Sequence, residues 1–362
     1  MTEADITAAL RANQPFEDLP EISVKSVRSQ KGPPDLRVTL NVAGRKVAVF
    51  GELKNECTPL AAAQIAPWLR QLKQARPSDG VALICPILSP ESQKICVENG
   101  IDFIDLAGNV SIQIPGSLYV YRVGRKRATG SGTPVLRDPY SGRASRVLRV
   151  LLEKPRSWRI VDIAEELQKE SGRDLKPRDF EVSPASISKT IKSLTEQLLV
   201  RRQDGAISVP EPKRLLLRWA EKYRERYKWG LRSSFKLQNL FGDNLLDVSQ
   251  GLRREGAVFA FTGVAAAIQD APYVDLSTID VVVPREDSTV LRALEPAGRR
   301  GPDLRIIHPY DAGVFLYQRD RNGLPLVSPV QVFLDLYARG GRDYKQAEHY
   351  LSAVIEPRWK NH

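Results

Sequence analysis

The pattern of hydrophobic and polar residues over residues 1–120 predicts one α/β unit. Two periodic stretches, 59–74 and 90–99, begin with a proline, which suits the first turn of a helix. The fully apolar run 81–85 is typical of a strand that is buried on both faces. After an N-terminal helix, the expected strands are 22–27, 36–42, 47–52, 81–85, 102–106, 110–114 and 118–123.

Residues 140–230 have a different pattern, in which apolar residues recur at helical spacing. In the third helical stretch Ser183 is suited to the N-cap and Pro184 to the first helical position. A turn at 203–206 then joins two short strands. Three helices and a hairpin predict a winged helix-turn-helix, with helices at 141–153, 160–169 and 184–194.

From residue 235 onward the pattern returns to mixed α/β, and its order is similar to a nucleotidyltransferase layout. That layout needs a Gly-Ser pair before a helix and an Asp-x-Asp pair on the next strand to bind two metal ions. Here Val264 stands in place of the serine and Val282 in place of the second carboxylate. We therefore expect an inactive domain in which Asp280 is structural. Its strands are expected at 258–262, 277–283, 304–308 and 313–317, and its helices at 329–337 and 344–354.

Near the N-terminus, Pro34-Asp35 and Glu52-Leu53-Lys54 are separated by sixteen residues. This spacing resembles that of the PD-(D/E)xK restriction-endonuclease-like superfamily. Two carboxylates on adjacent strands can hold Mg²⁺, and a lysine two residues after the second one lies on the same face and can assist an attacking water. Asp35, Glu52 and Lys54 are the candidate catalytic residues, with Asp35 and Glu52 as metal ligands. Further candidates are the upstream carboxylates and following glutamines Glu17, Glu21, Gln64 and Gln71.

The chain is therefore expected to be an α/β multidomain protein. We predict a restriction-endonuclease-like domain at 1–124, a winged helix-turn-helix with a linker helix at 140–230, and a nucleotidyltransferase-like domain at 235–362. The segment 125–139 is rich in Gly, Ser, Pro and Arg, has no period, and is expected to be a basic linker.

The net charge of +11 is concentrated beside the predicted winged helix. Residues 121–160 hold eleven Lys and Arg against two acidic residues, and residues 199–236 hold eleven against four. A concentrated excess favours contacts with nucleic-acid phosphates. The candidate DNA-binding residues, which share short polar or cationic side chains, are Ser183, Ser186, Ser188, Lys189, Lys192, Arg201, Arg202, Arg143 and Arg146.

Three segments resemble AbiEi-family antitoxins, which are transcriptional regulators of type IV toxin–antitoxin systems. They are 52–55 (ELKN), 100–109 (GIDFIDLAGN) and 328–336 (SPVQVFLDL). The resemblance implies a winged helix that represses its own operon and a C-terminal domain that counters a nucleotidyltransferase-like toxin. Smaller members carry the winged helix at the N-terminus, whereas here it is central.

Three functions remain open from the sequence. The first is a sequence-specific duplex-DNA-binding regulator that needs no cofactor, forms a homodimer and acts as an antitoxin. The second is a Mg²⁺-dependent DNA nuclease, and the third is a plasmid replication or partition factor. No apolar run is long enough for a membrane span and no zinc-type spacing occurs among three cysteines and three histidines, so a cytoplasmic protein is expected.

Overall fold

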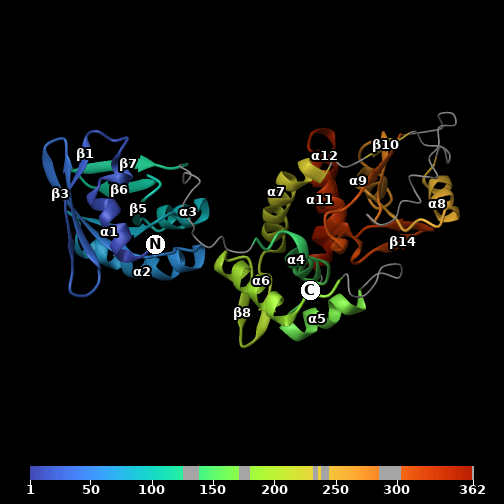
Figure 1. Cartoon of the computed structure of the whole chain (residues 1–362), viewed down its shortest axis with the longest axis horizontal. Helices are drawn as coiled ribbons and strands as arrows, with labels where there is room; N and C mark the ends of the chain where they lie inside the picture. The colour runs from blue at the N-terminus through green and yellow to red at the C-terminus, as the bar shows by residue number, and fades with distance from the viewer. Residues whose placement is uncertain (125–137, 171–179, 231–234, 238–243, 285–302, 361–362) are drawn as a thin grey trace. The chain divides into compact units, whose positions relative to one another are not determined.

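The structure, a computed structural model, describes residues 1–124, 138–170, 180–230, 235–237, 244–284 and 303–360. Almost all of the linker predicted at 125–139 lies outside these residues. The chain is a mixed α/β protein that divides into two compact units (Figure 1). The first holds residues 1–136 with 196–198, and the second holds residues 137–195 with 199–362.

The first unit is built on a seven-stranded sheet whose strands lie in chain order. Strands β3, β4 and β5 are parallel, and the other neighbours are antiparallel. Parallel neighbours need a crossover, which α2 (Pro59–Ala75) and α3 (Pro90–Glu98) supply. The strands are β1 (Ile22–Ser29), β2 (Leu36–Val42), β3 (Arg45–Leu53), β4 (Gly80–Cys85), β5 (Asp102–Asp105), β6 (Val110–Ile114) and β7 (Leu118–Arg122).

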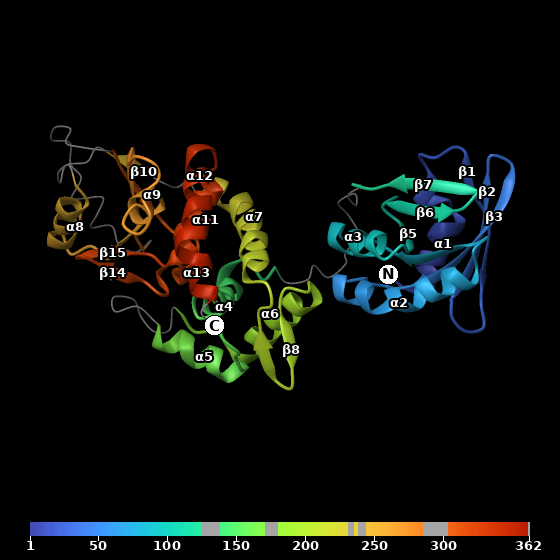
Figure 2. The same cartoon turned by 180° about the vertical axis from the view of Figure 1, so that it is seen from behind.

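Helices cover both faces of this sheet (Figures 1 and 2). On one face α1 (Glu3–Arg11) packs with Val49 and Leu53 of β3 in one apolar cluster. On the other face α2 and α3 pack in a second cluster with β4 and β5. Because successive strand residues point to opposite faces, Phe50 and Glu52 of β3 lie on the α2 side.

The second unit begins with three helices followed by a two-stranded hairpin. Trp158 forms a β-bridge with Ile207, so the segment before α5 extends the hairpin. The elements are α4 (Gly142–Glu153), α5 (Ile160–Lys169), α6 (Pro184–Glu196), β8 (Arg201–Gln203) and β9 (Ala206–Ser208).

A six-stranded sheet forms the rest of the second unit, in the order β10-β13-β12-β11-β15-β14. Its strands are β10 (Phe235–Leu237), β11 (Ala260–Thr262), β12 (Thr278–Val282), β13 (Asp303–Ile307), β14 (Arg319–Arg321) and β15 (Leu324–Leu326). The helices are α7 (Pro212–Gly230), α8 (Leu245–Arg254), α9 (Gly263–Ala267), α11 (Pro329–Arg339), α12 (Gly341–Tyr350), the π-helix η5 (Leu351–Ile355) and α13 (Glu356–Lys360).

The prediction of a strand at 313–317 is wrong. The chain forms a 3₁₀ helix there, η4 (Ala312–Phe315), because the Asp311 side chain accepts a hydrogen bond from the Gly313 backbone N–H at 2.8 Å. None of the described helices is long and apolar enough to cross a membrane.

One apolar core runs through the whole second unit, from Tyr140 to Ile355. Helix α7 lies beside α11 (Figure 2), and buried polar contacts also link α4 to the C-terminal residues. Glu153 Oε1 accepts a hydrogen bond from the Val330 N–H at 2.8 Å, for example. The boundary predicted at 230–235 therefore does not separate two cores, because the apolar side of α4 is covered by elements from both sides of it.

Candidate functional site

The three candidate catalytic residues of the first unit lie together at the end of β3. Asp35 directly precedes β2, and its Oδ2 accepts a hydrogen bond from the Leu53 backbone N–H at 2.8 Å. Lys54 Nζ donates to Glu52 Oε1, also at 2.8 Å. Because Leu36 pairs with Gly51, the residues that adjoin them, Asp35 and Glu52, are neighbours across the two strands.

Burial makes Glu52 the unusual member of this group. Its side chain is 12% exposed, whereas that of Lys54 is 39% exposed. Oxygen Oε2 of Glu52 is buried and has no hydrogen-bond partner among the described residues. A buried carboxylate oxygen without a donor costs free energy, and carboxylate oxygens from adjacent strands are suitable ligands for Mg²⁺. The residues present therefore fit a divalent cation.

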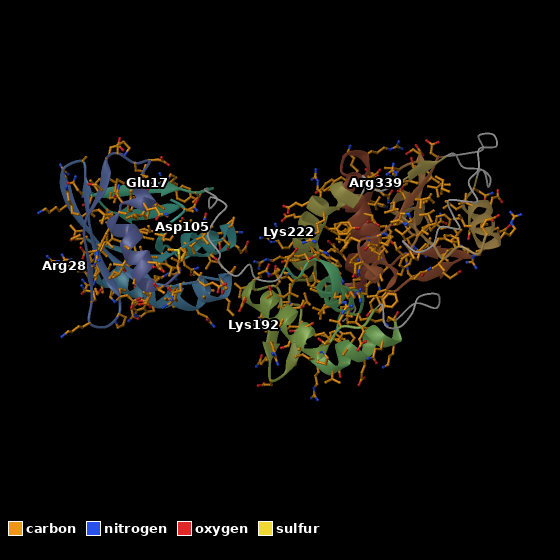
Figure 3. The ribbon with its side chains drawn as sticks, viewed as in Figure 1. Glu17, Arg28, Asp105, Lys192, Lys222 and Arg339 are labelled. Carbon is orange, nitrogen blue, oxygen red and sulfur yellow. The ribbon has the colours of Figure 1, made fainter. Side chains whose placement is uncertain are left out.

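The upstream carboxylates do not join this group. Glu17, labelled in Figure 3, follows the 3₁₀ helix η1 (Gln14–Phe16), which packs on the α1 side of the sheet. Glu21 lies at the opposite end of the β1–β2 pair from Asp35, where its carbonyl accepts a hydrogen bond from the Ala43 N–H. Neither extends the Asp35–Glu52 pair.

The glutamines predicted after the motif, Gln64 and Gln71, are both exposed on α2. Among the described residues, no group of three or more His, Cys, Asp or Glu side chains could hold a metal ion. The three cysteines are buried and unpaired, and burial raises the thiol pKa of Cys57 and of Cys96 to about 12. The candidate site of this unit is thus a carboxylate pair with one lysine.

The second candidate site is the solvent-facing side of α6. The helix begins at Pro184, and the Ser183 Oγ accepts a hydrogen bond from the Ser186 N–H at 3.3 Å, as an N-cap does. The i, i+4, i+7 residues of this helix are fully buried, namely Ile187, Ile191 and Leu194. The opposite side presents exposed Lys189 and Lys192 (the latter labelled in Figure 3), with partly exposed Ser186 and Ser188 beside them.

The β8–β9 hairpin adds two cations to the same three-helix segment. Arg201 and Arg202 are both exposed on β8. The turn between the strands is Asp204-Gly205, and both residues have positive φ angles. Such a turn is typical of a tight two-residue hairpin and brings the strand ends together.

Arg146 is not available to bind DNA, which corrects the sequence prediction. Its side chain is 5% exposed, and it forms a two-point ion pair with Asp311 at 2.9 and 2.7 Å. Arg143, one turn earlier on α4, is exposed as expected. Arg149 is also buried, with its guanidinium 2.6 Å from the side-chain oxygen of Gln331. The local count of cations therefore overstated the surface charge.

Asp280, on β12, is a buried carboxylate with charged side chains beside it. Burial raises the pKa of this carboxyl to about 6, against the lowering effect of Arg339 and Arg305. Arg339 (labelled in Figure 3) approaches both of its oxygens, at 2.5 and 3.2 Å. A Cβ at Gly263 would meet Asp280 Oδ2 at 2.6 Å. These contacts give Asp280 a structural role in this unit.

Two of the segments singled out in the sequence, 100–109 and 328–336, have local structural roles. Asp105, labelled in Figure 3, accepts backbone hydrogen bonds from Leu88 at 3.0 Å and Asn109 at 2.9 Å and so closes the loop 105–109. Ser328 caps α11 by accepting from the Gln331 N–H at 3.2 Å. Both side chains thus satisfy backbone groups of their own loop or helix.

No family model and no curated protein matches the chain. Among solved structures, the apo form of EndoMS is similar to part of it, with 18% identity and a TM-score of 0.23. The match covers 29% of this chain and 46% of that one, which is less than half of its length. So distant a likeness says nothing about function.

Proposed function

We propose that the protein binds double-stranded DNA through α6 and the β8–β9 hairpin, which together act as a winged helix-turn-helix. The observation that carries the proposal is the two-sided character of α6. One side is fixed in the core by Ile187, Ile191 and Leu194, and the other presents Lys189 and Lys192 to solvent.

This arrangement suits a major groove in two respects. A helix fits the groove, where serine hydroxyls and lysine ammonium groups can contact base edges and phosphates. The exposed Arg201 and Arg202 can contact the neighbouring backbone. Because α6 is held in the core, its exposed face is rigid and does not have to be ordered on binding.

We further propose that DNA binding serves transcriptional regulation. The resemblance to AbiEi antitoxins extends this to repression of the protein's own operon, binding as a homodimer to two half-sites, and a nucleotidyltransferase-like toxin as partner. A footprint over the region upstream of its own gene is the direct test, and the absence of any protected site there would contradict autorepression.

The DNA-binding proposal is tested with Lys189→Ala/Lys192→Ala. If each lysine neutralises one phosphate, the slope of log affinity against log salt should fall by roughly 2, because each contact releases counterions. The matched control is Lys345→Ala/Arg254→Ala, which removes two exposed cations from α12 and α8. Fluorescence anisotropy with a labelled duplex from the region upstream of its own gene measures the affinity of both variants. Equal affinities of the two variants would refute the assignment of α6.

A second function is favoured by one observation: the Oε2 of Glu52 is buried and has no hydrogen-bond partner in the part of the chain that the structure describes. We propose that Asp35 and Glu52 hold a divalent cation for phosphodiester hydrolysis. Such a cation, when bound, supplies Lewis-acid activation of the phosphate and a more acidic water. Lys54 is held beside the pair by Glu52 and can orient the attacking water.

Cation binding and cleavage test this second function separately. Titration calorimetry with Mn²⁺ should show one site that Asp35→Asn and Glu52→Gln each weaken by about tenfold or more. Glu56→Gln, which alters an exposed carboxylate of the following loop, is the control. Plasmid incubated with Mg²⁺ or Mn²⁺ should be cleaved by the wild type and by the control only. Absence of both Mn²⁺ binding and cleavage in the wild type would exclude the nuclease.

A further inference from the structure

On the α2 side of strands β1–β3, two arginines and a phenylalanine form a row across the strands. Arg28 of β1 pairs with Arg37 of β2, and Arg37 pairs with Phe50 of β3, so the three lie in one row on one face. The Arg37 guanidinium lies 5.7 Å from the centre of the Phe50 ring, and the Arg76 guanidinium, at the end of α2, lies 4.1 Å from it. In Figure 3 Arg28 lies at the edge of the unit among these strands.

This row is electrostatically unfavourable in the protein alone. Arg28 and Arg37 are both exposed, and neither forms an ion pair within the described part of the chain. Like charges directly opposite each other on adjacent strands destabilise a sheet. Lys46 of β3, also exposed, adds a further cation on the same face, since it pairs with Asn41, four residues after Arg37. An anion that bridges Arg28 and Arg37 would relieve the repulsion.

The row lies beside the carboxylate pair. Glu52 follows Phe50 by two residues on β3, so its carboxylate points to the same face as the row, and Asp35 adjoins Glu52 across the two strands. At the usual rise of a strand, residues two positions apart, such as Phe50 and Glu52, are separated by about 7 Å. Phe50 is 6% exposed beneath the two guanidiniums, so bases cannot stack on it. The contacts that this face offers to DNA are therefore charge contacts with the phosphate backbone.

We propose that Arg28 and Arg37 form a second DNA-binding surface, which holds phosphates of a duplex beside the Asp35–Glu52 pair. It belongs to the first unit and is distinct from α6 of the second unit. It therefore adds a contact that the winged helix does not provide. Removing the two cations should weaken DNA binding without weakening the fold.

The test uses the full chain in EDTA, where cation-dependent cleavage cannot occur. Arg28→Gln/Arg37→Gln should lower the slope of log affinity against log salt by roughly 2 if each arginine neutralises one phosphate. The matched control, Arg45→Gln/Lys94→Gln, removes two exposed cations from the start of β3 and from α3. It should leave the slope unchanged. Equal slopes for the two variants would overturn the proposal.

Repeating both variants in the Lys189→Ala/Lys192→Ala background separates this surface from α6. If α6 substitution leaves binding unaltered while Arg28→Gln/Arg37→Gln lowers it, the α6 assignment fails and the second surface stands. If the background still binds DNA but Arg28→Gln/Arg37→Gln has no further effect, the second surface is refuted. If the background has lost all binding, the slopes measured without the α6 substitutions decide. The denaturation midpoint of Arg28→Gln/Arg37→Gln should equal or exceed that of wild type, and a lower midpoint would assign the two arginines to the fold instead.

Discussion

At the scale of single residues, burial decides which cations of the basic segment can meet a ligand. Arg143 and Arg146 are three residues apart on α4, yet only Arg143 faces solvent. Arg146 is paired with Asp311, which lies far away in the sequence. Composition cannot distinguish the two, because a local count of charges contains nothing about distant partners.

Arg146→Gln should destabilise the protein strongly. It leaves the carboxylate of Asp311, whose side chain is 9% exposed, without its partner. Removal of one partner from a buried ion pair costs about 3–5 kcal/mol. Urea denaturation measures the loss, and Arg143→Gln should stay within about 0.5 kcal/mol of wild type. Similar stabilities for the two variants would contradict the buried pair.

The pH dependence of stability tests Asp280. Burial raises its pKa from 3.8 to about 6, so the folded state binds this proton more tightly than the unfolded state. The resulting stability is present below about pH 4 and is lost as the pH rises through about 6. The free energy of unfolding of wild type, minus that of Asp280→Asn, should therefore fall by about 3 kcal/mol between about pH 3 and about pH 7. A constant difference would mean that Asp280 stays ionised throughout.

At the scale of elements, local patterns predicted most helices and strands closely. Strands β2 and β6 have the expected bounds, and α6 begins at the expected proline after its serine cap. Local patterns did not predict the β14–β15 hairpin, and they predicted a strand where the chain forms η4. Short apolar runs are ambiguous because their conformation depends on contacts outside the run, such as the Asp311 cap of η4.

The junction of β11 and α9 requires glycine for two reasons. Gly263 has a φ of +58°, and an added Cβ would lie 2.6 Å from Asp280 Oδ2 and 3.1 Å from Arg339 Nη1. Gly263→Ala should therefore cost roughly 3 kcal/mol, from backbone strain and from displacement of a buried ion pair.

Gly142→Ala is a control for the strain alone. Gly142 has a φ of +52° and nothing within 4 Å of its Cβ position. Gly142→Ala should lower the free energy of unfolding by only about 1 kcal/mol, because the left-handed backbone conformation is its single unfavourable effect. Thermal or urea denaturation of both variants measures the difference. Equal losses of stability would show that the ion pair beside Gly263 moves aside at no cost in free energy.

At the scale of the whole molecule, residues 140–230 do not form a separate core. Tyr223 of α7 donates to Asp335 of α11 at 2.6 Å, and Gln331 of α11 accepts from Arg149 of α4 at 2.6 Å. Thr262 of β11 donates to the other oxygen of Asp335. These buried groups lose their partners if the second unit is divided at residue 230, and unpaired buried polar groups are costly.

Fragments test this organisation. A fragment of residues 138–362 should unfold in one cooperative transition, because a single apolar core joins its two halves. A fragment of residues 138–230 should be unfolded or have much lower stability. Circular dichroism during urea titration distinguishes them. A stable, cooperative 138–230 fragment would restore the separate domain that the sequence predicted.

By itself the sequence determined the local elements and the residue pairs that lie close along one strand or helix. Glu52 and Lys54 lie on one side at the end of β3, and Ile187 and Ile191 share a side of α6, because these spacings follow from backbone geometry. Only the tertiary structure decided that Arg146 is buried, that Glu21 is remote from Asp35, and that two predicted domains share one core. Each of these outcomes depends on segments that are distant along the chain, and no local period records which distant side chain will cover a surface.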